Sequence, residues 1–247
     1  MTRTLDGKSA LVTGASRGIG AVIARRLAAD GAHVTLTYAS SSGAADAVVT
    51  EIKNSGGQAR AIAADARQSG ASANAVADTV AHQGGLDILV SNAGINISKP
   101  IEHLSDDDYE AVFDINVRAS FEIIRAASAQ MRPGGRIVAV TATIANSYFA
   151  PGLALYGASK AAVNGLVQGW SRDLGPKGIA INAIVPGPID TDMNPDGTEL
   201  SGFLKSQVPL GRYGRSEEIA ALAAFLVGPE AGFITGSRII IDGGLTA

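Results

Sequence analysis

Two residues with acid–base chemistry, Tyr156 and Lys160, stand four positions apart at the start of a stretch with helical periodicity. Side chains at i and i+4 lie on one face of a helix, so the phenol and the ammonium face the same way. A free tyrosine has a pKa of about 10, and a nearby ammonium favours the phenolate and lowers that pKa. The pair therefore predicts proton transfer to or from a substrate oxygen.

A second chemical signal is the glycine-rich run 13–20, which reads TGASRGIG. Gly14 permits a tight turn, Gly18 lets the backbone approach a pyrophosphate, and Gly20 allows close helix–strand packing. A helix that begins here offers free N–H groups to an anion. The run predicts a dinucleotide phosphate site formed by Gly14, Ser16, Arg17, Gly18, Ile19 and Gly20.

These residues need a scaffold, and the chain alternates between strand and helix patterns. Strands are predicted at 9–13, 33–38, 59–64, 86–91, 136–140, 180–185 and 238–241. Helices are predicted at 18–29, 43–54, 71–83, 106–131, 156–174 and 216–227, with Ser105 and Ser216 as N-caps. This alternation requires a parallel sheet with helices on both faces, so we expect an α/β, Rossmann-type doubly wound fold with seven strands.

No linker, repeat or low-complexity tract divides the chain, so residues 1–247 are predicted to form one domain. The most irregular stretch, 186–212, contains four prolines and four glycines. A loop of this length in a compact domain is usually functional, so we expect a mobile substrate lid. Leu200, Phe203 and Leu204 would supply its apolar face.

The composition excludes several classes of protein. Hydrophobic residues make up 46% and charged residues 17%, which excludes a disordered chain. There is no cysteine, and the three histidines lack ligand spacing, so no metal site is expected. The net charge of −3 argues against a nucleic-acid polymer as partner. Residues 1–8 form no apolar leader, and no apolar run approaches the roughly 20 residues of a membrane span, so we expect a cytoplasmic protein without membrane contact.

Four motifs occur in a telling order: the glycine run, Asn92-Ala93-Gly94, Tyr156-x-x-x-Lys160 and Pro186-Gly187. Together they resemble the classical short-chain dehydrogenase/reductase family over essentially the whole chain. The resemblance implies that Tyr156 protonates a developing alkoxide while hydride arrives from a nicotinamide, and that Lys160 also holds the nicotinamide ribose. It also implies that Asn116 marks a helix irregularity that supports a water molecule near the lysine.

The family places a serine 13 residues before the tyrosine, and this chain has Thr143 there. Its hydroxyl can hydrogen-bond a substrate oxygen, although the branched side chain is stiff. Counting forward from Arg136 instead puts Ala142 at this position, in which case Thr143 only ends the strand. Both alignments stand at this point.

The resemblance also implies cofactor contacts at the ends of successive strands, by Tyr38, Ser40, Asp65, Asn92, Ala93, Gly94, Pro186, Gly187, Ile189 and Thr191. Asp65 is equally well explained as a turn residue. NAD-specific folds usually carry a carboxylate at the end of the second strand, but here the first one is Asp46. Ser40 can donate to a 2′-phosphate and Arg17 can pair with it, so NADP(H) is the expected cofactor.

The expected activity is therefore that of a carbonyl reductase or alcohol dehydrogenase, acting on a small ketone or a 3-oxoacyl-carrier thioester. A carrier protein would need a basic docking patch, for which Arg125, Arg132, Arg172 and Lys177 are candidates. The alternative is a cyclic-dinucleotide-binding regulator of the biofilm-dispersal type, which the stretch 187–192 also resembles. Retention of both Tyr156 and Lys160 favours the enzyme. Because helix 156–174 is apolar or small on most sides, we expect a homo-oligomer, and the resemblance implies a homotetramer.

Overall fold

The computed structural model describes residues 3–148 and 150–247. A seven-stranded sheet with the order β3-β2-β1-β4-β5-β6-β7 forms its centre, and all neighbouring strands are parallel. The strands are β1 (Ser9–Val12), β2 (His33–Tyr38), β3 (Gln58–Ala63), β4 (Ile88–Ser91), β5 (Arg136–Val140), β6 (Ala180–Pro186) and β7 (Arg238–Ile241). The predicted doubly wound fold with seven parallel strands is confirmed.

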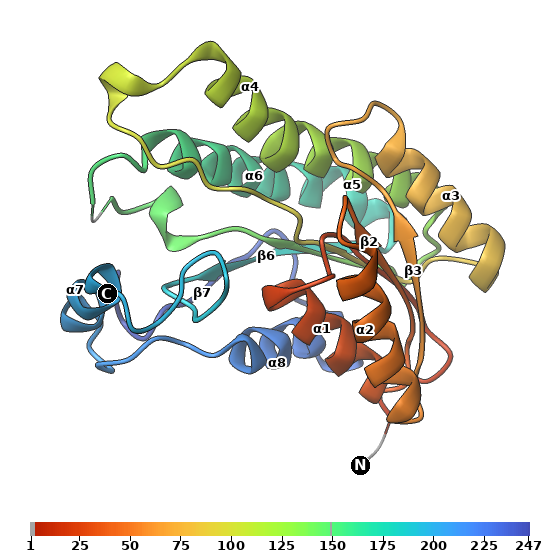
Figure 1. Ribbon diagram of the computed structural model, residues 1–247. Helices are drawn as coiled ribbons and strands as arrows, with labels where there is room; N and C mark the ends of the chain where they lie inside the picture. Colours follow the sequence, from red (N-terminus) through yellow and green to blue (C-terminus); the bar gives the residue numbers. More distant parts are fainter. Residues whose placement is uncertain (1–2, 149) are drawn as a thin grey trace.

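Helices cover both faces of the sheet (Figure 1). One face carries α1 (Gly18–Ala29), α2 (Ser42–Asn54) and α8 (Ser216–Val227), and the other carries α3 (Ala71–Gln83), α4 (Asp106–Phe113), α5 (Ala119–Gln130) and α6 (Ala154–Leu174). Each face has its own buried apolar cluster, around Leu36 and Ile219 on the first and around Leu89 and Ile181 on the second. Burial on both sides explains why β1, β4 and β6 read as continuous runs of small and apolar residues.

The strand order places a ligand crevice at a defined point of the sheet. β1 pairs with both β2 and β4, so the chain leaves the centre of the sheet in opposite directions. Ligands of open α/β sheets bind beyond the carboxyl ends of the strands at such a switch point. The glycine loop follows β1 and the Asn92–Gly94 motif follows β4, so the fold brings both to this crevice.

The predicted long helix over 106–131 is interrupted. It consists of α4, a π-helical turn over Asp114–Arg118, and α5. Asn116 lies in the π turn, so the expected irregularity at this residue is confirmed. Ser105 caps α4 as predicted, since its Oγ accepts from the Asp108 N–H at 3.2 Å.

The N-cap predicted at Ser216 is wrong. Ser216 is the first residue of α8, and Arg215 precedes it in extended conformation. The Arg215 N–H donates to the Glu218 carboxylate at 2.8 Å, so an acid three residues along supplies the cap instead.

The segment 186–212 contains a helix that the sequence reading missed, α7 (Glu199–Gln207). Thr198 caps it by accepting from the Ser201 N–H at 3.1 Å. Leu200 and Phe203 are about half exposed, whereas Leu204 is buried. Of the three residues predicted to form the apolar face of this segment, Leu204 packs inside the protein and Leu200 and Phe203 stay accessible. In the described ranges, every helix is too short or too polar to cross a membrane.

Candidate active site

Tyr156 and Lys160 lie in the first two turns of α6, on the face turned toward the crevice. The Lys160 Nζ is 5.7 Å from the centre of the Tyr156 ring. It is deeply buried and donates a hydrogen bond to the Val140 carbonyl at 3.2 Å, at the carboxyl end of β5. The sheet therefore fixes the ammonium at the crevice floor, beside the phenol.

Burial controls the protonation of this pair. It raises the pKa of Tyr156 to about 12, and it lowers the pKa of Lys160 to about 8. The expectation that the ammonium lowers the tyrosine pKa is wrong for the protein alone, because Nζ is hydrogen-bonded to a backbone carbonyl and both groups are desolvated. At neutral pH the phenol is therefore protonated, as a proton donor must be.

Asn116 connects three elements at the same place. Its Oδ1 accepts from the Ile95 N–H at 2.8 Å, and its Nδ2 donates to the Ile95 carbonyl at 3.0 Å and to the Ser159 hydroxyl at 2.9 Å. A Cβ placed on Gly94 would lie 3.1 Å from both the Asn116 Oδ1 and the Lys160 Nζ. The predicted residues Asn116 and Lys160 thus meet at Gly94.

Thr143 follows β5 in a short 3-10 turn, Thr143–Ala145, that packs against α6. Its side chain is 2% exposed, and its carbonyl accepts from the Asn146 N–H at 2.9 Å. The neighbouring hydroxyl of Thr141 is already used, since it donates to the Ile184 carbonyl at 3.1 Å. Ala142 lies between them in extended conformation. Of the two alignments, only the one with Thr143 supplies a hydroxyl, on a turn that packs against α6.

The glycine loop is a cradle that side chains would fill. Gly14 and Gly18 have φ of 61° and 56°, and a Cβ on Gly14 would lie 2.8 Å from the Ala93 Cα. A Cβ on Gly20 would lie 2.5 Å from the Asn92 Nδ2. The Asn92 amide donates to the carbonyls of Thr13 and Gly14 at 3.0 and 3.1 Å, so it holds the loop in shape. Its donors are spent on the protein, which makes Asn92 a support of the cofactor loop.

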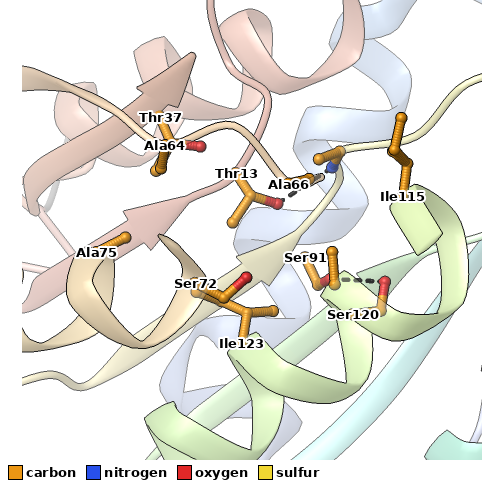
Figure 2. Close-up of a pocket in the computed structure, with 12 residues that line it drawn as sticks. Thr13, Thr37, Ala64, Ala66, Ser72, Ala75, Ser91, Ile115, Ser120 and Ile123 are labelled. Carbon is orange, nitrogen blue, oxygen red and sulfur yellow. Dashed lines mark hydrogen bonds between the residues drawn. The ribbon is translucent and has the colours of Figure 1, made fainter. Parts of the chain in front are cut away.

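A second recess lies between the strand ends and the helices α3 and α5 (Figure 2). Small residues line most of it, among them Thr13, Thr37, Ala64, Ala66, Ser72, Ser91 and Ser120, and Ile115 adds a larger apolar side chain. Ser91 and Ser120 are joined by a 3.3 Å hydrogen bond, and the Ser120 hydroxyl donates to the Asn116 carbonyl at 2.8 Å. The sequence reading missed most of these residues, whose only signal is small size at strand ends.

Asp65 lies just beyond β3, but its carboxylate is held locally. It accepts from the Arg67 guanidinium at 2.7 Å and from the Arg67 N–H at 3.0 Å, and these bonds lower its pKa. This is an Asx turn, which agrees with the turn alternative for Asp65. Tyr38 ends β2 with its carbonyl bound to the Ala64 N–H, and Ser40 is exposed just before α2.

Arg17 is exposed at the start of α1 and lines an open groove of about 660 Å³. The groove runs between α1 and the first turns of α2, and Ser16, Ala44 and Ala47 line it as well. Arg17 thus shares a groove with α2, the helix that follows β2, and the segments 190–192 and 215–217 line the same groove. Ile19, the next residue after Gly18, is packed against the core of this face.

The Pro186–Thr191 segment is held from two sides. Gly187 donates to the Ile241 carbonyl at 3.0 Å, and its Cα faces Asp242 so closely that a Cβ would lie 2.6 Å from the Asp242 Cβ. Ile189 is buried, and Thr191 lies over the glycine loop, where a Cβ on Gly18 would be 3.9 Å from its Cγ2. The segment is therefore fixed against the end of β7 on one side and lies over the glycine loop on the other.

A clamp joins this segment to α8. The Gly214 N–H donates to the Pro188 carbonyl at 2.9 Å, and the Asp190 N–H donates to the Gly214 carbonyl at 3.1 Å. The Glu218 carboxylate accepts hydrogen bonds from two Arg212 guanidinium nitrogens at 2.9 and 2.7 Å. This pairing lowers the pKa of Glu218 to about 2. The segment 186–212 is thus tied to the start of α8 at its C-terminal end.

The site offers no metal chemistry among the residues described, since no group of three or more His, Asp or Glu side chains there is placed to hold an ion. What it offers is a proton donor, a neighbouring ammonium, a buried threonine and a glycine-lined crevice.

Comparisons with known proteins agree with this arrangement. A family model described as enoyl-(acyl carrier protein) reductase matches residues 14–246. The chain is 42% identical over 241 residues to the cyclic-di-GMP-binding biofilm dispersal mediator protein of Escherichia coli (strain K12), covering 98% of each. It is 40% identical over 256 residues to the hydroxynaphthalene reductase-like protein Arp2 of Metarhizium robertsii, covering 98% of this chain and 96% of the relative.

A solved structure of a short-chain dehydrogenase from Burkholderia cenocepacia J2315, in complex with NADP, has a TM-score of 0.97 to this chain. The two are 47% identical, and the match covers 99% of this chain and 100% of that one. On the shared fold and these likenesses over nearly its whole length, the chain belongs to the classical short-chain dehydrogenase/reductase family of oxidoreductases.

Proposed function

We propose that this protein is an NADPH-dependent carbonyl reductase, reversible as an alcohol dehydrogenase, that acts on a ketone or 3-oxoacyl compound. The observation that carries the proposal is that the Lys160 and Asn116 side chains meet at Gly94. Lys160 is one helical turn from Tyr156, and Gly94 follows Ala93, which packs on the glycine loop. A proton donor and a dinucleotide cradle therefore share one crevice.

The residues present fit a dinucleotide. A side chain at Gly14 would clash with Ala93, so the loop is built for close approach of backbone to a ligand. The first turn of α1 has no side-chain cap among the described residues, which leaves its N–H groups for phosphate oxygens. The bound nicotinamide supplies or accepts hydride. The solved Burkholderia relative holds NADP, and an exposed Arg17 in a groove shared with α2 supports the same choice here.

The chain's own groups carry the proton chemistry. The Tyr156 hydroxyl gives its proton to the carbonyl oxygen as that oxygen gains negative charge, and the Thr143 hydroxyl donates a hydrogen bond to the same oxygen. The Lys160 ammonium beside the ring stabilises the phenolate that results. Asn116 bonds to Ile95 and to Ser159 of α6, and so fixes the part of α6 that carries Lys160. From this position Lys160 returns a proton to Tyr156.

The test is to incubate the protein with NADPH and a panel of ketones while the absorbance of NADPH is followed. Wild type consumes NADPH with at least one ketone, and Tyr156→Phe does not. Equal rates for the two proteins, or no consumption with any ketone, would overturn the proposal.

The lid and the assembly complete the proposal. The segment 186–212 closes over the substrate, with Leu200 and Phe203 as its apolar contacts. Two separate apolar faces support a homotetramer: Phe121 with Trp170 on α5 and α6, and Phe225, Phe233 and Ile240 near the β7 edge. Each face can form one isologous contact. Light scattering at micromolar concentration gives four times the 25.0 kDa chain mass if this is right.

A second candidate function is binding of a cyclic dinucleotide, which the Escherichia coli relative's name describes for that protein. The open groove beside Arg17 supports it, because arginines and a helix N-terminus favour phosphates. Calorimetric titration with cyclic-di-GMP, with and without NADPH, separates the two functions. Binding that excludes NADPH, together with no ketone reduction, favours the regulator.

A further inference from the structure

One aromatic side chain lies against Gly157, the residue that follows Tyr156, and has no role so far. The Tyr148 ring lies against the first turn of α6: a Cβ on Gly157 would be 2.6, 2.7 and 2.8 Å from the ring's Cε1, Oη and Cζ. Gly157 is therefore the residue that lets this ring lie flat on the helix. The other side of Tyr148 is open, since the residue is 55% exposed.

The chain fixes this ring close to the reacting groups. After the 3-10 turn that begins at Thr143, the Ser147 N–H donates a hydrogen bond to the Thr143 carbonyl at 3.1 Å. Further along, the Gly152 carbonyl accepts from the Lys99 N–H at 3.2 Å, which ties this loop to the segment after Gly94. Tyr148 thus directly follows the bonded Thr143–Ser147 turn, and its ring packs on the first turn of α6 at Gly157.

Three cations in the segments that follow Gly94 and form the proposed lid are each paired with a carboxylate. Lys99 binds both oxygens of Asp108 at 2.8 and 2.7 Å, Lys205 pairs with Asp196, and Arg212 pairs with Glu218. Glu102 and Glu199 add further negative charge to the segments that carry Lys99 and Lys205. This charge disfavours a phosphate or carboxylate on the substrate beside these segments.

Of the four cations considered for carrier-protein docking, Arg125 lies within α5 over the Phe121 ring, and the other three are far from Tyr156. Arg172 lies in the last turn of α6, and Arg132 and Lys177 follow the ends of α5 and α6. With a rise of 1.5 Å per residue, Arg172 is about 24 Å along the helix from Tyr156. They lie at the end of the sheet opposite the crevice.

We propose, building on the proposed reductase function, that the substrate is an uncharged ketone with a flat aromatic group, and that Tyr148 determines this specificity by stacking on that group. The exposed ring face, the helix behind it and the paired cations all favour an apolar planar surface over an anionic thioester. Offset stacking of two rings contributes about 1 kcal/mol beyond the area buried, which corresponds to about fivefold in kcat/KM.

The experiment compares matched substrates with NADPH. α-Tetralone and cyclohexanone share the cyclic ketone and differ by the fused benzene ring. The acetoacetyl thioesters of N-acetylcysteamine and coenzyme A share the oxo group and differ by the phosphates. We expect α-tetralone to be the better of the ketones and the coenzyme A thioester to be no better than its neutral counterpart.

The variants then test Tyr148 itself. Tyr148→Ala lowers the kcat/KM ratio of α-tetralone to cyclohexanone about fivefold, Tyr148→Phe keeps it, and Gly157→Ala lowers it by displacing the ring. Tyr109→Ala, a tyrosine of similar exposure stacked on Phe113 of α4, leaves the ratio unchanged. A preference for the coenzyme A thioester, or an unchanged ratio in Tyr148→Ala, overturns the proposal.

A binding measurement separates this inference from the proposed function. Saturation-transfer NMR of α-tetralone with the NADP⁺ complex reports contact to the aromatic protons without any reaction. A signal that Tyr148→Ala removes supports the aromatic subsite even if no ketone is reduced. Reduction of other ketones without this signal leaves the reductase standing and refutes the role of Tyr148.

Discussion

The Lys160 Nζ lies 5.7 Å from the centre of the Tyr156 ring and is hydrogen-bonded to the Val140 carbonyl instead of the phenol. The two groups therefore share a helix face without a direct bond. In the protein without cofactor, burial shifts the pKa of each group so that its neutral form is favoured. At neutral pH the site therefore holds a protonated phenol at Tyr156 and a Lys160 ammonium whose pKa is lower than that of a free lysine.

The first prediction is a pH dependence of stability. An unfolded lysine has a pKa of about 10.4, and burial lowers that of Lys160 to about 8. Between these values the unfolded chain binds more protons, so Lys160 makes wild type more stable as the pH rises. Relative to Lys160→Met, wild type gains about 2.5 kcal/mol between pH 7 and 10. Urea unfolding of both cofactor-free proteins across this range measures it, and a constant difference would contradict the lowered pKa.

Tyr156→Phe removes only the acidic hydroxyl. Ketone reduction should fall to near background, because the charge on the carbonyl oxygen is no longer protonated. The dissociation constant for NADPH, measured by fluorescence titration, should stay within about threefold of wild type, since the phenyl ring is retained. A large loss of NADPH binding would instead give the hydroxyl a role in holding the cofactor.

Thr143→Ala should lower kcat by about 10²-fold, the usual cost of one donor to a developing oxyanion. Thr143→Ser keeps the hydroxyl and should restore most of the rate. Steady-state kinetics on one ketone decides between them. Full activity of the alanine variant would show that Thr143 is not the substrate's hydrogen-bond donor.

Arg17→Ala should raise the KM for NADPH at least tenfold and leave that for NADH nearly unchanged, because only NADPH carries the 2′-phosphate. The control is Arg25→Ala, a second arginine of α1 in the same groove that is paired with Glu51 at 2.6 Å. Equal weakening of both cofactors by Arg17→Ala would mean that the guanidinium does not contact the 2′-phosphate.

Glu218→Gln should loosen the stem of the lid. The bidentate pairing with Arg212 is lost, so the bonds from Gly214 to the Pro188–Asp190 segment open more often. Amide hydrogen exchange in 188–194 should speed up, while that in α3 at the far side of the sheet stays the same. Unchanged exchange in 188–194 would place the stability of the stem elsewhere.

The sequence predicted most of the scaffold because strands buried on both faces and amphipathic helices leave strong patterns. Helix α7 was missed because prolines and glycines surround it, and the cap by Thr198 is a local feature that these residues obscure. The π turn at Asn116 followed only from a family resemblance, since nothing in its neighbours disrupts a helix pattern.

The sequence indicated which residues lie together in the candidate site better than it indicated their protonation. The strand order brings Tyr156, Lys160, Asn116 and the glycine loop to one crevice, as their motifs indicated. The pKa of Tyr156 depends on where the lysine side chain is directed and how deeply both groups lie, which spacing does not contain. Tyr148 carried no pattern at all, and only its contact with Gly157 reveals it.

The position of β1 in the middle of the sheet also has a consequence for synthesis on the ribosome. β1 pairs with β4, and about 75 residues separate Val12 from Ile88. At 5–20 residues per second, one edge of the β1–β3 half-sheet waits roughly 4–15 s for its partner strand. During this interval one edge of the apolar strand β1 has no partner strand. Codon usage and chaperone access between residues 40 and 90 should therefore affect the yield of folded protein more than changes near the C-terminus.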